Sequence, residues 1–151
     1  MPPCENAGGI EGCYVWKNNT GCRISVCGSW PVSWLYVDAP SYNRTYSKKN
    51  YDGKAPSFSL WDGGEQEFLC PQFHLGFVKR NMNRMWEAGL KLDGIYLDVF
   101  SCVALDECYD KEHRVTREQC KAERKSCFDY MRSLGCIVSS EEGIGWAMKD
   151  L

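Results

Sequence analysis

The chain has 151 residues and a net charge of −2, from 18 basic and 20 acidic residues spread along it. It carries no basic stripe of the kind that neutralises phosphates, which argues against nucleic acid as a partner. No apolar run reaches about 18 residues, so the sequence predicts no membrane span and no membrane partner. Residues 1–9 have neither the basic start nor the apolar stretch of a secretory signal, and we therefore expect a cytoplasmic protein.

Ten cysteines are many for this length, and two glycosylation sequons begin at Asn18 and Asn43. The six cysteines from residue 70 onward lie in helix-like or strand-like runs, which predicts buried, unpaired thiols. A disulfide-rich secreted module is the alternative. There is no CxxC motif, and His74 and His113 are the only histidines. The sequence therefore predicts neither a metal site nor a cofactor.

The N-terminal part of the chain has little periodic pattern. Residues 1–29 are rich in Gly, Asn and Cys, and only the run 22–27 alternates as a strand does. We treat 1–29 as a poorly specified segment and 30–151 as the organised region. Residues 33–37 are typical of a short buried strand, which must end before Pro40 because proline cannot donate a ladder hydrogen bond.

The organised region continues with a loop and then a helix. Residues 42–65 contain repeated Asp-Gly turn signals, and the short apolar run 67–70 predicts a strand that ends at Pro71. Over 72–88 large apolar side chains recur at helical spacing on one face. Gly89 stands where a helix C-terminal glycine is expected.

The same order of elements then repeats. Residues 92–99 predict a strand, and a polar loop follows it. Thr116-Arg-Glu-Gln119 has the pattern of a capping box, so we expect a helix over 116–134, closed by Gly135. Residues 136–139 form a last short apolar strand.

Alternation of strand, helix and glycine predicts an α/β fold with parallel strands and with both helices packed on one side of the sheet. The interval from Gly89 to Gly135 suits one unit of a (β/α)₈ TIM-type barrel with a long loop. A complete barrel needs roughly 200–250 residues, so we expect a partial barrel and a fragment of a longer protein.

Two carboxylates define the candidate catalytic site. Asp98 lies at the C-terminal end of one predicted strand and Glu141 at the end of the next, and active sites of parallel α/β folds gather at that edge. Neighbouring strand ends can hold two carboxyl groups about 5–5.5 Å apart, the separation that a retaining glycosidase requires. Glu142 competes with Glu141 for the acid/base role. Acidic residues also end strands simply as turn formers, and this remains an alternative for each of them.

Aromatic residues could contribute to sugar binding, because aromatic rings stack on sugar faces. Trp61, Trp146 and Tyr96 are the candidates for contacts with a carbohydrate substrate. Most buried tryptophans instead belong to the core, which is the simpler interpretation of each.

Several segments together carry a resemblance to a known group of enzymes: 92–101, 107–110, 116–117, 132–135 and 138–142, with 38–41 and 69–71. They resemble the catalytic region of bacterial barrel glycosidases similar to endo-α-N-acetylgalactosaminidases (glycoside hydrolase family 101) and α-N-acetylgalactosaminidases (family 129). The resemblance covers roughly residues 35–151. It implies a retaining hydrolase of an α-N-acetylgalactosaminide or a related α-glycoside, with Asp98 as nucleophile and Glu141 as acid/base.

Two other functional interpretations stay open. One is a non-catalytic remnant of a barrel. The other is a metal-dependent hydrolase that uses the oxygen ligands of Asp98, Glu141 and Glu142. The sequence does not indicate an oligomeric state.

Overall fold

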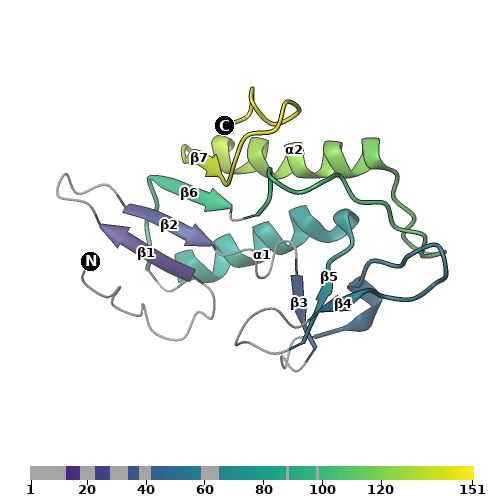
Figure 1. The fold of residues 1–151 in the computed structure, drawn as a ribbon. Helices are drawn as coiled ribbons and strands as arrows, with labels where there is room; N and C mark the ends of the chain where they lie inside the picture. Colours follow the sequence, from purple (N-terminus) through teal and green to yellow (C-terminus); the bar gives the residue numbers. More distant parts are fainter. Residues whose placement is uncertain are drawn as a thin grey trace.

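The computed structural model describes residues 13–17, 23–27, 34–37, 42–58, 65–87, 89–97 and 99–151. They form two sheets and two α-helices, which Figure 1 shows as a larger sheet beside the helices and a smaller sheet at one end. Within these residues, no helix has both the length and the apolar character needed to cross a membrane.

The larger sheet has the order β1-β2-β6-β7, with β1 (Cys13–Lys17) antiparallel to β2 (Arg23–Cys27). Strands β2, β6 (Gly94–Leu97) and β7 (Ile137–Ser140) run parallel. The prediction of at least three parallel strands is confirmed, as is the strand expected within 22–27. The described part of the sheet is open, with β1 and β7 at its edges.

The first connection between parallel strands ends in α1 (His74–Glu87), which follows the 3₁₀ turn η2 (Pro71–Phe73). Proline is tolerated at the start of a helical segment, where its missing N–H would have no partner. Gly89 follows with φ of +77°, the left-handed conformation that glycine adopts at low cost. The predicted helix over 72–88 is confirmed.

The second connection contains α2 (Arg117–Ser133) and confirms the helix predicted over 116–134. Its capping box forms as expected: the Thr116 hydroxyl accepts the Gln119 N–H, and the Gln119 side chain accepts the Thr116 N–H. Gly135 then adopts φ of +81° and turns the chain into β7.

One core joins both helices to the parallel strands. Ile95 and Leu97 alternate along β6 and are almost fully buried, and Val138 of β7 pairs with Ile95 in register. The helices add their apolar faces to this cluster through Val78, Met82, Met85, Cys127, Phe128 and Met131. Because the inward strand residues share one face, both helices cover the same side of the sheet, as the sequence predicts.

The smaller sheet has the order β3-β5-β4 and is antiparallel, with strands β3 (Trp34–Tyr36), β5 (Gln66–Phe68) and β4 (Ser57–Phe58). The short 3₁₀ turn η1 (Arg44–Tyr46) lies between β3 and β4. The expectation that the strand before α1 joins the parallel sheet is wrong. That position belongs to β2, and the small sheet is an insertion between β2 and α1.

The side chain of Glu67 gives a physical reason for this placement of β5. Glu67 is only 5% exposed, and its carboxylate accepts hydrogen bonds from the hydroxyls of Tyr42 (2.8 Å) and Ser47 (2.5 Å). A buried carboxylate needs such donors, and the segment inserted between β3 and β5 supplies them. A central strand of a parallel sheet is buried on both faces, and it would leave the Glu67 carboxylate without these donors.

Candidate active site

The parallel register brings the ends of β6 and β7 together. Leu97 and Ser140 are paired, and the Ser140 hydroxyl donates to the Leu97 carbonyl at 2.5 Å. In the sequence, Asp98 follows the first and Glu141 follows the second. Asp98 itself lies outside the described residues. The pairing shows that the described strands β6 and β7 end level with each other, and the placement of Asp98 beside Glu141 stays a prediction.

Ser101 ties the loops after the two strands to each other. It is fully buried, and its backbone N–H donates to the Ser140 hydroxyl at 3.1 Å. Its single hydroxyl proton is shared between the backbone carbonyls of Glu141 (2.7 Å) and Glu142 (2.8 Å). The described part of the loop after β6, from residue 99 onward, is therefore fastened to the backbone that carries Glu141.

The Glu141 side chain is half-buried and has a thiol beside it. The Cys102 sulfur donates to Glu141 Oε2 at 3.6 Å. Burial, followed by the charge of Glu141, raises the pKa of Cys102, so the thiol keeps its proton and can donate. Glu142 is exposed. This difference favours Glu141 over Glu142 for the acid/base role, which stays a prediction.

Backbone strain is present in both loops at this edge. Val99 has φ of +56° and Glu142 has φ of +43°. A β-branched residue is a real outlier at positive φ, and each such residue costs about 1–3 kcal/mol. Strain of this kind is frequent at catalytic sites, where packing holds the chain in the conformation that the chemistry needs.

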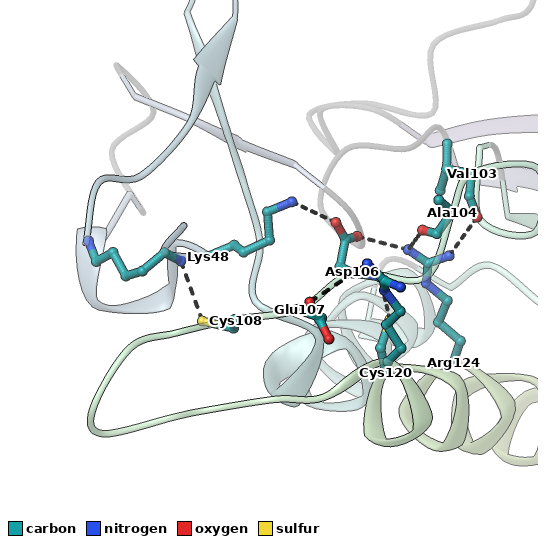
Figure 2. Close-up of polar contacts among 10 residues, drawn as sticks. Lys48, Val103, Ala104, Asp106, Glu107, Cys108, Cys120 and Arg124 are labelled. Atoms are coloured by element: carbon teal, nitrogen blue, oxygen red, sulfur yellow. Dashed lines mark hydrogen bonds and ion pairs between the residues drawn. The ribbon is translucent and has the colours of Figure 1, made fainter. Parts of the chain in front are cut away.

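A buried arginine of α2 supports the loop after β6. The Arg124 side chain is 1% exposed, and its guanidinium donates to three loop carbonyls, those of Phe100 (3.3 Å), Val103 (3.2 Å) and Ala104 (3.3 Å). It also pairs with Asp106 at 3.0 Å. Figure 2 shows the Asp106 carboxylate between Arg124 and Lys48, and the Lys48 ammonium lies 2.6 Å from it. Lys48 belongs to the insertion, so this network joins the insertion, the loop and α2.

The candidate sugar-binding aromatics lie in different surroundings. Tyr96 is half-buried and lies on the face of β6 opposite the core residues Ile95 and Leu97. The Trp146 ring stacks on Phe128 with centroids 6.2 Å apart, so it packs against the core on the helix side. Trp61 lies outside the described residues. Carbohydrate contacts by these side chains stay predictions.

Sequence reasoning missed the residues that support the site. Ser101 gives no signal, because a serine after a strand is common in loops. Arg124 does give one: it follows Cys120 by four residues and precedes Phe128 by four, which places a cation in the apolar stripe of α2. A charge there requires buried partners, and the loop carbonyls provide them.

We compared the chain with known proteins. No model of a protein family matches it, and no curated protein sequence does. Several solved structures of one bacterial glycoside hydrolase match it. This enzyme is the α-N-acetylgalactosaminidase NagBb from Bifidobacterium bifidum. The ligand-free structure is 37% identical, with a TM-score of 0.76 over 80% of this chain and 20% of the enzyme. Its complexes with GalNAc and with Gal-NHAc-DNJ are 35% identical, with TM-scores of 0.78 over 83% and 20%.

These findings confirm the resemblance to bacterial α-N-acetylgalactosaminidases, to which the chain is similar in both sequence and structure. The chain spans about one fifth of the length of the enzyme that it matches. The similarity therefore concerns one part of that enzyme, the part with parallel strands and covering helices described above.

Proposed function

We propose that this chain is the catalytic segment of a retaining glycoside hydrolase that acts on an α-N-acetylgalactosaminide or a related α-glycoside. The observation that carries the proposal is the 35–37% identity, over at least 80% of the chain, to an α-N-acetylgalactosaminidase that also forms a complex with GalNAc. The aligned ends of β6 and β7 support it. In a longer protein that contained this segment, further βα units would close the barrel around this edge.

The chemistry divides between the two carboxyl groups. In the first step Glu141 gives its proton to the glycosidic oxygen as the bond to the anomeric carbon breaks, and an oxygen of Asp98 bonds to that carbon. In the second step a water molecule attacks the anomeric carbon and gives a proton to the Glu141 carboxylate, which releases Asp98 as a carboxylate. Two inversions leave the sugar with its original anomeric configuration.

The surroundings of Glu141 suit this dual role. Ser101 fixes the backbone carbonyl of Glu141, and the Cys102 thiol donates to Oε2. The first contact fixes the backbone of Glu141, and the second holds its carboxyl group while that group loses and regains a proton. Positioning of this kind contributes to catalysis because the reacting atoms must meet within a few tenths of an ångström.

The test is hydrolysis of aryl and alkyl α-N-acetylgalactosaminides, by this chain and by a longer protein that contains it. We expect the Asp98→Asn protein to lose turnover of both substrates. The Glu141→Gln protein should lose about 10²–10⁴-fold on the alkyl glycoside and far less on an activated aryl glycoside, whose leaving group needs no proton. Azide should restore the second step in Glu141→Gln, because this anion needs no general base.

Glu142→Gln is the matched control and should retain activity. If Glu142→Gln instead loses far more activity on the alkyl glycoside than on the aryl glycoside, then Glu142 and not Glu141 is the acid/base residue. Unchanged activity in Asp98→Asn would contradict the proposed mechanism. NMR of the first-formed product should show the α-anomer, and a β-anomer would exclude retention. If the segment is instead a non-catalytic remnant of a barrel, no protein that contains it should hydrolyse either substrate.

A further inference from the structure

Three side chains with metal-binding atoms converge away from the candidate active site. The ligand atoms of Cys70, Cys108 and His113 all lie within 4.8 Å of one another, and all three residues are buried. Cys70 follows β5, whereas Cys108 and His113 belong to the loop between β6 and α2. Two sulfurs and an imidazole nitrogen thus come together from two segments of the chain.

The spacing of these atoms suits a tetrahedral ion. With Zn–S near 2.3 Å and Zn–N near 2.05 Å, a sulfur and a nitrogen bound to the same zinc lie about 3.5 Å apart. The Cys108 sulfur lies 3.4 Å from His113 Nδ1. A small shift of the Cys70 sulfur would complete three corners of the tetrahedron.

Both sulfurs have backbone donors that stabilise a thiolate. Cys108 accepts the Lys49 N–H at 3.4 Å and also a backbone hydrogen bond from Asp110, two residues further on. Cys70 accepts a backbone hydrogen bond from Gln72, at the same spacing. The Cys70 thiol donates to the backbone carbonyl of His113 at 3.5 Å. Zinc would replace this contact, because cysteine binds the metal as a deprotonated thiolate.

The imidazole is oriented for the same purpose. His113 Nε2 lies 3.5 Å from a carboxylate oxygen of Asp110, so a proton on Nε2 leaves the Nδ1 lone pair free to face the sulfurs. A histidine that binds a metal usually donates its other N–H to a carboxylate in this way. The Phe73 ring packs edge-on against the imidazole at 5.1 Å and limits its rotation.

We propose that Cys70, Cys108 and His113 bind a zinc ion, with Asp110 as the carboxylate that orients His113. Two thiolates and an imidazole favour zinc over calcium or magnesium, which take oxygen ligands. A fourth ligand, water, can enter from the open pocket of about 310 Å³ next to His113, which is also lined by Lys49 and Asp110. The ion would join the end of β5 to the loop after β6.

The site complements the arginine network at the other end of the same loop. Arg124 and Asp106 hold residues 100–106, and the zinc would hold 108–113. The ligands are 38 residues apart at their widest gap, between Cys70 and Cys108, so no motif in the sequence reveals them. The sequence predicted no metal site because it contains no CxxC motif and only two histidines, and such local signals miss ligands that come from separate segments.

Metal content of the reduced full chain tests the proposal directly. We expect one zinc per chain by elemental mass spectrometry after dialysis. Cobalt(II) in its place should give thiolate-to-metal charge-transfer bands and the strong visible bands of a tetrahedral ion. Cys70→Ser, Cys108→Ser and His113→Gln should each lower zinc affinity by more than the ~10–100-fold expected for Asp110→Asn. Cys136→Ser, which alters a buried cysteine outside the group, should bind zinc as the wild type does.

A labelling experiment keeps the test valid if a variant fails to fold. In the wild-type chain, zinc should protect Cys70 and Cys108 from iodoacetamide, and a chelator should remove the protection, while the labelling of Cys102 stays unchanged. The proposal is overturned if the reduced chain binds no zinc, or if the Cys136→Ser control loses the metal together with the ligand variants. A Cys70–Cys108 disulfide in the chain as isolated from cells would also overturn it, because both sulfurs would then be consumed.

Discussion

Replacement of Arg124 by methionine tests the support of the loop that follows β6. The change keeps the apolar stem within the α2 stripe and removes the guanidinium. Three backbone carbonyls then lose a donor, and Asp106 loses one of its two cations. Lys48 remains 2.6 Å from the Asp106 carboxylate, so that charge is not left unpaired.

The magnitude follows from these contacts. Removal of one partner of a buried ion pair costs about 3–5 kcal/mol when the other charge is left without compensation. Because Lys48 compensates Asp106 in part, we expect the lower end, about 3 kcal/mol. With a urea dependence of about 2 kcal/mol per molar, the unfolding midpoint should fall by about 1.5 M. The assay is equilibrium unfolding in urea, followed by circular dichroism and by tryptophan fluorescence to test two-state behaviour.

Arg117→Met provides the matched control, because it makes the same change in the same helix. The Arg117 side chain is 70% exposed and lies 3.8 Å from Glu107, so its loss should cost no more than about 0.5 kcal/mol. If Arg124→Met is no more destabilising than Arg117→Met, then the buried network contributes nothing measurable and the reasoning fails. If the loss persists unchanged in an Asp106→Asn background, the carbonyl contacts alone are responsible.

Three further predictions concern stability. Burial lowers the pKa of His74 to about 3, whereas a histidine in the unfolded chain titrates near 6.5. Below pH 6.5 the unfolded chain therefore takes up a proton that the folded chain does not. The free energy of unfolding should be highest above pH 6.5 and fall by up to ~1.4 kcal/mol per pH unit as the pH drops towards 3. Urea unfolding from pH 7 to 4.5 measures this slope, which His74→Gln should reduce; an equal slope in both proteins would contradict it. Ser101→Ala should cost about 1–3 kcal/mol, because two backbone carbonyls lose a buried donor, while Ser133→Ala at the exposed end of α2 should change the unfolding free energy by less than about 0.5 kcal/mol. Thr116→Ala should cost about 1 kcal/mol through loss of the helix cap, measured in thermal unfolding against Ser126→Ala, and equal values for the two would argue against a capping role.

Local patterns predicted much of the fold. The helical spacing before Gly89 and the capping box at Thr116 gave α1 and α2, and the apolar runs gave β6 and β7. The six cysteines from Cys70 onward are unpaired, as predicted. The expected placement in helices and strands holds only for Cys120 and Cys127 of α2, since the other four lie outside these elements. The neighbour of β6 could not be predicted in this way. A short apolar run before a helix suits both sheets, and only the donors around Glu67 distinguish them.

The candidate site divides in the same manner. The predicted catalytic carboxylates were found from strand ends, which is local information. The residues that position them come from distant parts of the chain: Ser101 contacts a backbone 40 residues away, and Arg124 reaches 24 residues back to Phe100. One sequence carries no record of such pairs, and only the folded chain brings them together.

The parallel register also determines the order in which the chain can fold during synthesis. Strands β1 and β2 are separated by only five residues of sequence and can pair as soon as both leave the ribosome. The partner of β2 comes much later, because Gly94 lies 70 residues after Ile24 in the register. Until then one edge of the hairpin keeps its backbone groups unpaired, which is the condition under which strands recruit the wrong neighbour. At about 5–20 residues per second this exposure lasts several seconds, long enough for a chaperone to bind the nascent chain.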